Sequence, residues 1–499
     1  MVQLTKFKLP KLSHRRYINF LMLARIEGYL LVILAIFMLL PCFVSMLYET
    51  ESSVPFLISV GITAGAGLGM CFLKPKNKDM GRREAILLTG LTWVVLSLFG
   101  MLPFILYGTH MSVTDAFFET MSAFTTTGVS ILSTLDGVPK SILLWRCLMQ
   151  WFGGLGILLF TLAVVPMLNS AGGLLLFNAE VTGITHDKLR PRVSNTAKGL
   201  WGMYIALTLL LVILLSFSRM DFFDALCYGL STMSTGGFAT TDQGIVEFAS
   251  NYVKVVLTIF MFLGGINFVL LFHALQGNVH NLFRNSVFKL YCWLVVFGYV
   301  ALAIDSVMQG LYHNAEDLTV NPLFQCVSVI STTGISTPGF KSGGPLAIMV
   351  LFLFMSMGAC SGSTSGGAKI DRFLVMIKFL KNEFYKIMHP SAVTTVILNG
   401  KGTTPGMIYK TLAFLIMYVL VVVISGAIVS LTGVPLGEAV FRSLESISNS
   451  GICDVPGGLS GSYAHLPALG KWVYAFVMLT GRLEIFTVLL VFTPGFWHR

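Results

Sequence analysis

The sequence predicts an all-α integral membrane protein in which two N-terminal helices precede four copies of one unit. Each unit consists of a span, a short half-span and a second span. Composition, the length of the apolar runs and an internal repeat support this prediction. Of 499 residues, 55% are hydrophobic and 11% are charged, whereas soluble domains carry about 25% charged residues. So few charges cannot cover the water-facing surface of so long a chain, which excludes the soluble classes.

Several apolar runs reach the roughly 20 residues that a helix needs to cross a bilayer. They are Ile26–Leu47, a second run at 54–73, Ala85–Tyr107, Ser141–Leu168, Leu200–Phe217, Val253–Leu275, Phe288–Ile304 and Tyr409–Leu431. A transmembrane β-barrel would show short alternating segments instead. The first run follows a basic stretch, and no small-residue cleavage site is obvious, so we expect a retained helix rather than a signal peptide.

The placement of charge predicts the orientation of the chain. Lysine and arginine collect in short segments at 74–83, 186–198 and 369–386, while Glu316 and Asp317 lie in a segment on the other side. This is the positive-inside pattern, so we expect a multi-pass protein with its N-terminus in the cytoplasm. Topology and contact with anionic lipid account for the basic charge, and no nucleic-acid partner is expected.

Four segments between the apolar runs are too short to cross a membrane, and they align without gaps. They are DAFFETMSAFTTTGVS (115–130), DALCYGLSTMSTGGFA (224–239), NPLFQCVSVISTTGIS (321–336) and EAVFRSLESISNSGIC (438–453). One column holds glycine in every copy, and each copy begins with Asp, Asn or Glu. We therefore expect an N-terminal unit at 1–84 and repeats at 85–170, 171–277, 278–392 and 393–499.

Each column of the repeat has a physical reason. An acidic or amide residue can cap a short helix or oppose its positive N-terminal end. The C-terminal end of such a helix then lies inside the membrane, where roughly half a negative charge favours a cation. Glycine permits backbone angles that turn carbonyl groups toward one axis, and carbonyl oxygens can replace the hydration shell of a cation. Ordinary re-entrant turns are the alternative, but four copies in a common frame argue against them.

Other classes of protein fit the sequence less well. No Ser–His or Asp–Asp pair lies within the spans, so we expect a protein that is not an enzyme. A secondary transporter with inverted repeats would show two halves of opposite orientation, whereas these four copies share one orientation. The eight cysteines form no CxxC pair and the nine histidines form no HExxH motif, so no disulfide frame, metal site or bound cofactor is expected.

The four copies resemble the Trk/Ktr/HKT superfamily of cation transporters. The motifs that carry the resemblance are TTTGV at 125–129, STGGF at 234–238, STTGIS at 331–336 and SNSGIC at 448–453. The two spans before the first repeat are similar to the TrkH branch. The resemblance implies four units around one pseudo-fourfold pore and potassium as the transported substrate. It also implies a homodimer in the bacterial cytoplasmic (inner) membrane and a cytosolic, nucleotide-binding regulatory subunit of the TrkA type.

The resemblance further implies a selectivity filter in which backbone carbonyls bind potassium. Its residues would be Thr126, Thr127, Gly128, Val129, Thr235, Gly236, Gly237, Phe238, Thr332, Thr333, Gly334, Ile335, Asn449, Ser450, Gly451 and Ile452. Glycine rather than serine at 128 favours potassium over sodium. The fourth copy departs from the threonine-rich pattern, which leaves a sodium-selective or weakly selective conductor of the same fold as the alternative.

The second span of the third repeat is interrupted by MGACSGSTSGGAKIDR (357–372), in which glycine and serine are too frequent for a sound helix. The resemblance suggests an intramembrane gate loop formed by Gly362, Ser363, Thr364, Ser365, Gly366 and Gly367. A structural kink without a gating role is the alternative. The segment is not a phosphate-binding loop, because Ala368 separates Gly367 from Lys369.

Arg482 lies in the last apolar run, in the sequence TGRLEIFTVLLVF. An unpaired charge inside a membrane costs about 2.5–3.5 kcal/mol on insertion scales, so such a residue is functional by default. The resemblance places an arginine of this span in the pore below the filter, where it opposes the cation. A salt bridge with Glu484 or a position near the membrane interface is the alternative.

Overall fold

The computed structural model describes residues 18–48, 52–75, 81–107, 111–154, 156, 193–248, 250–337, 340–452 and 461–497. Within these residues, six helical segments are long and apolar enough to cross a membrane. They are α1 (Phe20–Leu47), α2 (Val54–Cys71), α3 with α4 (Arg82–Gly100 and Leu102–Leu106), α9 (Val193–Ser216), α14 (Ser286–Met308) and α18 (Pro405–Ser430). The basic N-terminal stretch, the second half of the predicted Ser141–Leu168 span and most of segment 186–198 lie outside the described residues.

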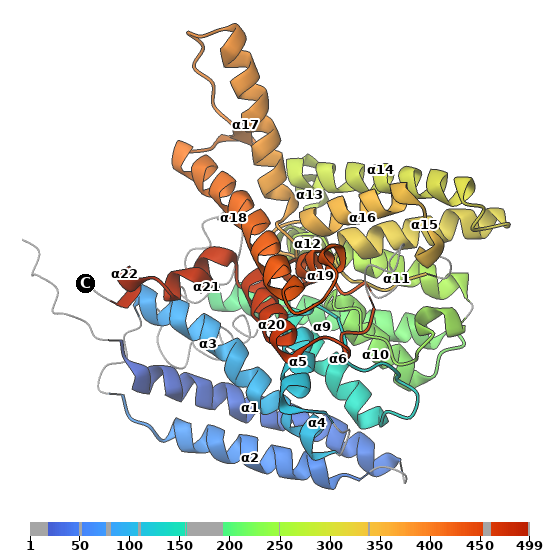
Figure 1. The fold of residues 1–499 in the computed structure, drawn as a ribbon, viewed down its shortest axis with the longest axis vertical. Helices are drawn as coiled ribbons and strands as arrows, with labels where there is room; N and C mark the ends of the chain where they lie inside the picture. The colour runs from blue at the N-terminus through green and yellow to red at the C-terminus, as the bar shows by residue number, and fades with distance from the viewer. Residues whose placement is uncertain are drawn as a thin grey trace, which may run out of the picture.

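The unit predicted from the sequence recurs along the chain. Short helices α5 (Val113–Phe124), α10 (Phe222–Met233), α15 (Ala315–Ile330) and α19 (Leu436–Ser448) each follow a spanning helix. Each is followed by a glycine segment and then by a second helix, which is α6 (Lys140–Gly154), α11 (Asn251–Gly264), α16 (Pro345–Met357) or α20 (Ala468–Arg482). In Figure 1, α5 and α19 lie near the middle of the molecule, and α10 and α15 lie toward its right-hand side.

The residues that open the repeat segments do not cap the short helices. Asp115, Asp224 and Glu438 instead lie in the first turn of α5, α10 and α19, where they oppose the positive N-terminal end, the other predicted alternative. In α5 the cap is Ser112, whose hydroxyl accepts from the Asp115 N–H at 3.2 Å, while Asp115 bonds Lys471 of α20 at 2.6 Å. In α15 the helix begins six residues before Asn321, whose side chain accepts from Lys254 of α11 at 2.8 Å. These polar residues therefore tie a short helix to the second helix of another repeat.

The second helices are broken in more repeats than the sequence predicted. The run Val253–Leu275 is not one helix: α11 and α12 (Phe268–Leu275) meet at 107°. Asn267 accepts from the N–H groups of Val269 and Leu270 and so caps α12. In the last repeat α20 and α21 (Ile485–Val491) meet at 119°. In the third repeat the predicted break separates α16 from α17 (Ile370–Met388).

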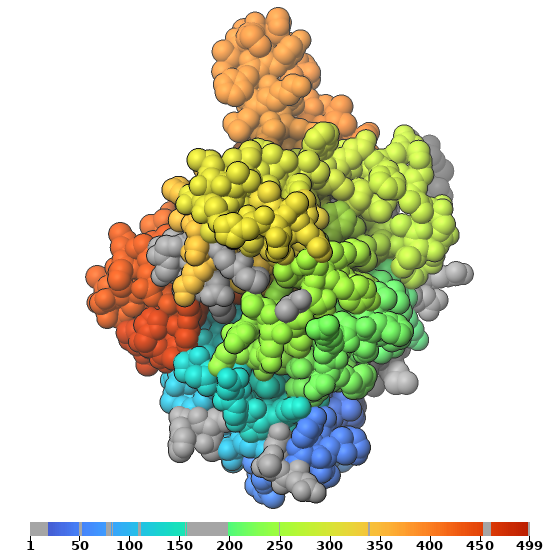
Figure 2. Space-filling view, turned by 90° about the vertical axis from the view of Figure 1, so that its right-hand side faces the viewer, coloured from blue at the N-terminus to red at the C-terminus, as the bar shows by residue number. Residues whose placement is uncertain are grey.

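The remaining elements are short. They are η2 (Gly244–Phe248), α13 (Val279–Arg284), η3 (Phe340–Ser342), the hairpin of β1 (Ile397–Leu398) and β2 (Lys401–Gly402), and α22 (Pro494–Trp497). Helix α17 projects from the body in both views (Figures 1 and 2), and the hairpin lies between it and the start of α14, bonded to Lys378 and Ser286. The spanning helices carry exposed apolar side chains such as Phe43, Leu209, Phe297 and Val419 on their outer faces, as contact with lipid requires.

Helices α1 and α2 pack through small residues, as membrane helices commonly do. Gly28 and Gly67 face each other so closely that a methyl group on Gly67 would lie 2.9 Å from Gly28 O and 2.9 Å from Val32 N. These atoms belong to the backbone, so no side-chain movement can relieve the overlap. The pair therefore needs glycine at position 67.

We predict that Gly67→Val lowers the free energy of unfolding by about 1–3 kcal/mol, because overpacking forces α1 and α2 apart. The control is Gly65→Val on the same helix, where an added Cβ meets nothing within 4 Å. The measurement is the melting temperature of the two purified variants. Equal melting temperatures would show that α1 and α2 do not depend on this contact.

Candidate cation site

The four glycine segments, 125–129, 234–238, 331–335 and 448–452, leave their short helices through the same turn. In each, a backbone N–H bonds a carbonyl five residues earlier. The pairs are Thr127 N to Ser122 O, Gly236 N to Ser231 O and Thr333 N to Ser328 O at 2.9 Å, and Ser450 N to Glu445 O at 3.1 Å. Since local hydrogen bonds fix this geometry, sequences far apart in the chain adopt one conformation.

The backbone of the glycine segments is held in left-handed conformations. The residue two before the glycine has a positive φ in every copy: 55° at Thr126, 55° at Thr235, 59° at Thr332 and 49° at Asn449. Threonine rarely adopts this conformation, which costs of order 1–3 kcal/mol when the surroundings impose it. Gly128, Gly237 and Gly334 also have positive φ, between 79° and 86°, whereas Gly451 does not.

The four glycine segments touch in a closed ring. A methyl group on Gly128 would overlap Gly236 O, one on Gly237 would overlap Thr333 O, and one on Gly334 would overlap Gly451 O. A methyl group on Gly451 would lie 2.6 Å from Thr127 O, so the fourth segment contacts the first and the ring is closed. The predicted glycines of all four repeats are therefore brought together around one centre, and backbone meets backbone at each step.

The fourth segment differs in chemistry as well as in conformation. Asn449 stands where the other copies have threonine, and its Nδ2 donates to Thr127 Oγ1 at 3.0 Å and to Met478 O at 2.9 Å. In the first segment Thr125 and Thr127 share a hydroxyl–hydroxyl bond of 2.8 Å, and Ser331 and Thr333 repeat it at 2.7 Å in the third. The ring therefore repeats one turn four times, but its fourth segment differs in the backbone angle at Gly451 and in its polar groups.

A buried ion pair lies behind the first glycine segment. Arg146 of α6 and Glu119 of α5 are 2.8 Å apart, with side chains 2% and 0% exposed. Glu119 also accepts from the Ile131 N–H at 2.8 Å, and the Arg146 guanidinium lies 4.0 Å from the centre of the Phe238 ring in the second segment. Our sequence reasoning missed Arg146 and its neighbour Gln150. The signal was present, since polar residues inside an apolar run mark functional contacts.

The predicted break in the third repeat, residues 358–369 (the break segment), contacts the glycine segments. Gly366 N donates to Thr332 Oγ1 at 2.7 Å, and Gly367 N donates to Ser448 O at 2.8 Å. Another contact leads to the bend between α11 and α12, where Phe268 N donates to Gly362 O at 2.9 Å. The break segment is thus held by three repeats.

Arg482 is the last residue of α20, at the bend before α21, and not within a continuous span as predicted. Its Nη1 donates to Thr364 O of the break segment at 2.9 Å, and its Nη2 donates to Gly154 O at 2.7 Å and to Gly153 O. Glu484, its alternative partner, forms an ion pair with Arg372 of α17. The arginine therefore joins the first, third and fourth repeats beside the break segment.

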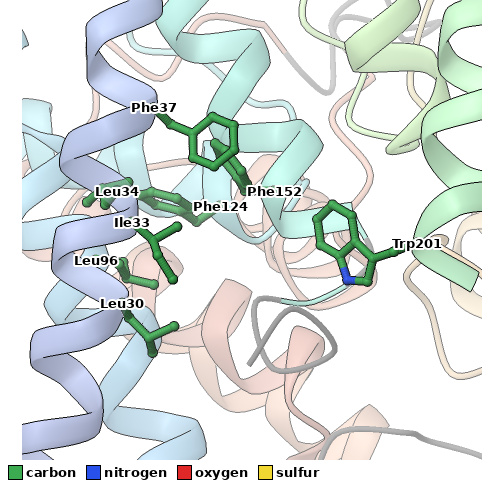
Figure 3. Close-up of a pocket in the computed structure, with 8 residues that line it drawn as sticks. All are labelled: Leu30, Ile33, Leu34, Phe37, Leu96, Phe124, Phe152 and Trp201. Atoms are coloured by element: carbon green, nitrogen blue, oxygen red, sulfur yellow. The ribbon is translucent and has the colours of Figure 1, made fainter. Parts of the chain in front are cut away.

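A separate cavity lies beside the first repeat, between α1, α3, α5, α6 and α9. Figure 3 shows its hydrophobic lining, which includes Leu30, Leu96, Phe124, Phe152 and Trp201. A cavity with such a lining stays dry and gives a cation no oxygen ligand. The polar ring of glycine segments, and not this cavity, is the candidate site for a cation.

Membrane-spanning helices around a ring of polar backbone define a membrane transport protein. A model of the TrkH family, described as a cation transport protein, matches residues 58–294 and 287–499. The chain belongs to the TrkH family of cation transport proteins. This membership confirms the predicted resemblance and the transporter class, in place of an intramembrane enzyme.

Relatives and a solved structure agree with this assignment. The chain is 34% identical over 487 residues to the Trk system potassium uptake protein TrkH of Vibrio parahaemolyticus, covering 96% of this chain and all of the relative. It is 28% identical over 475 residues to the Trk system potassium uptake protein TrkG of Escherichia coli K12, covering 94% and 97%. The crystal structure of the potassium transporter TrkH from V. parahaemolyticus matches with a TM-score of 0.87, at 31% identity, covering 96% of this chain and all of that one.

We predict that Gly237→Ala lowers the free energy of unfolding by about 1–3 kcal/mol, because alanine resists a φ of 79° and its methyl group overlaps Thr333 O. The matched control is Gly69→Ala in α2, where an added Cβ meets nothing within 4 Å. Thermal unfolding of both purified variants gives the comparison. A Gly237 variant as stable as the control would contradict the close contact between the second and third segments.

Proposed function

We propose that this protein carries potassium ions into the cell across the bacterial cytoplasmic (inner) membrane, through a pore at the centre of the four glycine segments. The observation that carries the proposal is the closed ring of backbone contacts from Gly128 through Gly237, Gly334 and Gly451. The names of the relatives, which are potassium uptake proteins, support the choice of ion. A pore formed by backbone needs no metal ligand or cofactor, and potassium is its substrate.

The proposed filter uses two sources of negative potential. The short helices α5, α10, α15 and α19 end at the glycine segments, so their C-terminal ends place partial negative charge at the ring. Backbone carbonyls supply uncharged oxygen ligands that replace the hydration shell of the ion. The proposed filter residues are 126–129, 235–238, 332–335 and 449–452. Because Asn449 makes the ring asymmetric, the alternative function is a sodium-selective or weakly selective conductor of the same fold.

The break segment is the proposed gate. Its residues Gly362–Gly367 lie against the third and fourth glycine segments, and Arg482 holds Thr364 O in place. Non-helical backbone at membrane depth is tolerated only where it is buried in protein or lines a cavity. Because Arg482 also bonds the end of α6, its loss removes this link between the break segment and the first repeat, while the bond from Gly367 N to Ser448 O of the fourth repeat remains. Its positive charge near the ring opposes a cation.

The projecting part of the third repeat is the proposed docking surface for a cytosolic, nucleotide-binding regulatory subunit of the TrkA type. Helix α17 carries exposed Lys381 beside exposed Phe384 and Ile387, a mixture of basic and apolar groups that suits a protein partner. The helix begins at the end of the break segment, so a partner bound to it can act on the proposed gate. The protein itself is proposed to form a homodimer, with its N-terminus in the cytoplasm.

We predict that liposomes containing the purified protein and the regulatory subunit take up potassium faster than sodium. The control is Gly451→Asp, whose added side chain overlaps the backbone of Gly128 and Val129 and so blocks the ring. The measurement is tracer uptake at equal concentrations of the two ions. Equal uptake would support the weakly selective alternative, and uptake that persists in the Gly451 variant would place the pathway elsewhere.

We predict that Arg482→Gln raises potassium uptake severalfold. Thr364 O of the break segment no longer accepts a hydrogen bond from the arginine, and the positive charge near the ring disappears. The matched control is Arg482→Lys, which keeps the charge and loses the forked hydrogen bonds. The measurement is the initial rate of uptake per reconstituted molecule. An unchanged or lower rate in folded protein would remove Arg482 from the gate.

A further inference from the structure

Gln150 is a fully buried residue of α6 in the first repeat whose side chain bonds the second glycine segment. Its Nε2 donates to Gly236 O at 2.8 Å, and its Oε1 accepts from Ser231 Oγ at 2.9 Å and from Phe238 N at 3.3 Å. The partners determine the orientation of the amide, because the Gly236 carbonyl only accepts and the Phe238 N–H only donates. One side chain therefore holds the end of α10 and both sides of Gly237.

The second segment needs this support because it lacks groups that the first and third segments use. In the first and third segments the residue before the glycine is Thr127 or Thr333, and its hydroxyl bonds the hydroxyl two residues earlier. The corresponding residue of the second segment is Gly236, which has no hydroxyl. In the first and third segments a serine of the short helix donates to the carbonyl after the glycine: Ser122 to Val129 O and Ser328 to Ile335 O, at 2.6 Å.

The corresponding serine of the second repeat, Ser231, donates to Gln150. A Cβ on Gly236 would lie 2.6 Å from Oε1 and 2.7 Å from Nε2 of Gln150. The Gln150 amide therefore fills the space that a side chain at position 236 would need, and its hydrogen bonds replace the missing hydroxyl network. A neighbouring repeat thus supplies what the second segment does not contain.

The same contact reaches the ring itself. Gly236 O is the atom that a methyl group on Gly128 would overlap, so it lies where the first and second segments meet. Its position is fixed on one side by the backbone of Gly128 and on the other by the Gln150 amide. The spacing and field strength of carbonyl oxygens are the properties by which such filters distinguish ions.

We propose that Gln150 is a positioning residue for ion selection: it holds Gly236 O and the second glycine segment at the spacing that suits potassium. This inference rests on the proposed function of the ring as a cation filter. Without the amide, the second segment can contract around a smaller ion, and the preference for potassium over sodium falls. The effect acts through the backbone, since Gln150 bonds Gly236 O and Phe238 N.

The test uses the full-length purified protein and compares its melting temperature over a range of KCl or NaCl concentrations at constant ionic strength. An ion that binds the folded state raises the melting temperature, so the two series give apparent affinities without requiring an open gate. Gln150→Ala is expected to lower the ratio of potassium to sodium affinity by about tenfold, the effect of one or two lost hydrogen bonds. Gln276→Ala, at an exposed position after α12, is the matched control and keeps the wild-type ratio.

A second substitution separates ion selection from loss of packing. Gly236→Ser adds a side chain that collides with the Gln150 amide, so this single variant is expected to lower the ratio of potassium to sodium affinity. In the double variant Gln150→Ala with Gly236→Ser the amide is gone, and the new hydroxyl can bond Ser234 as Thr127 bonds Thr125. We expect this double variant to regain most of the wild-type ratio, which filling of space alone would not achieve.

The outcomes are distinguishable. A wild-type protein that binds both ions equally would overturn the proposed potassium function and this inference together. A clear wild-type preference that Gln150→Ala leaves unchanged would overturn the inference alone. If Gln150→Ala does not fold, the ratio of potassium to sodium affinity is measured on Gln150→Glu instead. This variant keeps the size of the side chain and replaces the donor to Gly236 O with an acceptor. A wild-type ratio in that variant would equally refute the role of Gln150.

Discussion

The backbone of this protein leaves helical geometry between its membrane-spanning helices, and the rest of the structure depends on how the polar groups of that backbone are satisfied. Unpaired N–H and C=O groups cost several kcal/mol each in the absence of water. The break segment and the glycine segments share this problem and partly solve it for each other, since Gly366 N bonds Thr332 Oγ1 and Gly367 N bonds Ser448 O. The proposed gate and filter are therefore one hydrogen-bonded unit rather than two neighbouring parts.

The same requirement explains why four copies of one unit have different side chains behind the ring. The first segment is supported by Glu119 and Arg146, the second by Gln150, and the fourth by Asn449. Each partner is buried. Arg146, Gln150 and Asn449 each contact another repeat, whereas Glu119 bonds Arg146, Ser130 and Ile131 of its own repeat. Because the repeats lie in one chain, each can use a different solution, which a pore made of identical subunits cannot do.

Within the described residues, the sequence predicted most of the spans, the four short helices and the break in the third repeat, but not the bends after α11 and α20. The pair Gly264–Gly265 ends α11, but glycine in a helix costs only about 1 kcal/mol, too little to predict a bend of 107°. The bend is stabilised from outside, by the bond between Phe268 N and Gly362 O and by the cap from Asn267. Arg482 was expected inside a span for the same reason: its surroundings come from Gly154 and Thr364, which are remote in sequence.

The sequence by itself determined the membrane class, the unit that recurs four times and the glycine of each copy. These follow from composition, from apolar run length and from local hydrogen bonds, such as Thr127 N to Ser122 O, that a short segment forms alone. Only the tertiary structure decided the order of the segments around the ring, the position of Arg482 at a bend and the partnership of Gln150 with Gly236. The physical reason is that a buried polar group must find a partner wherever the fold places one, and the partners here lie 86 residues apart or more.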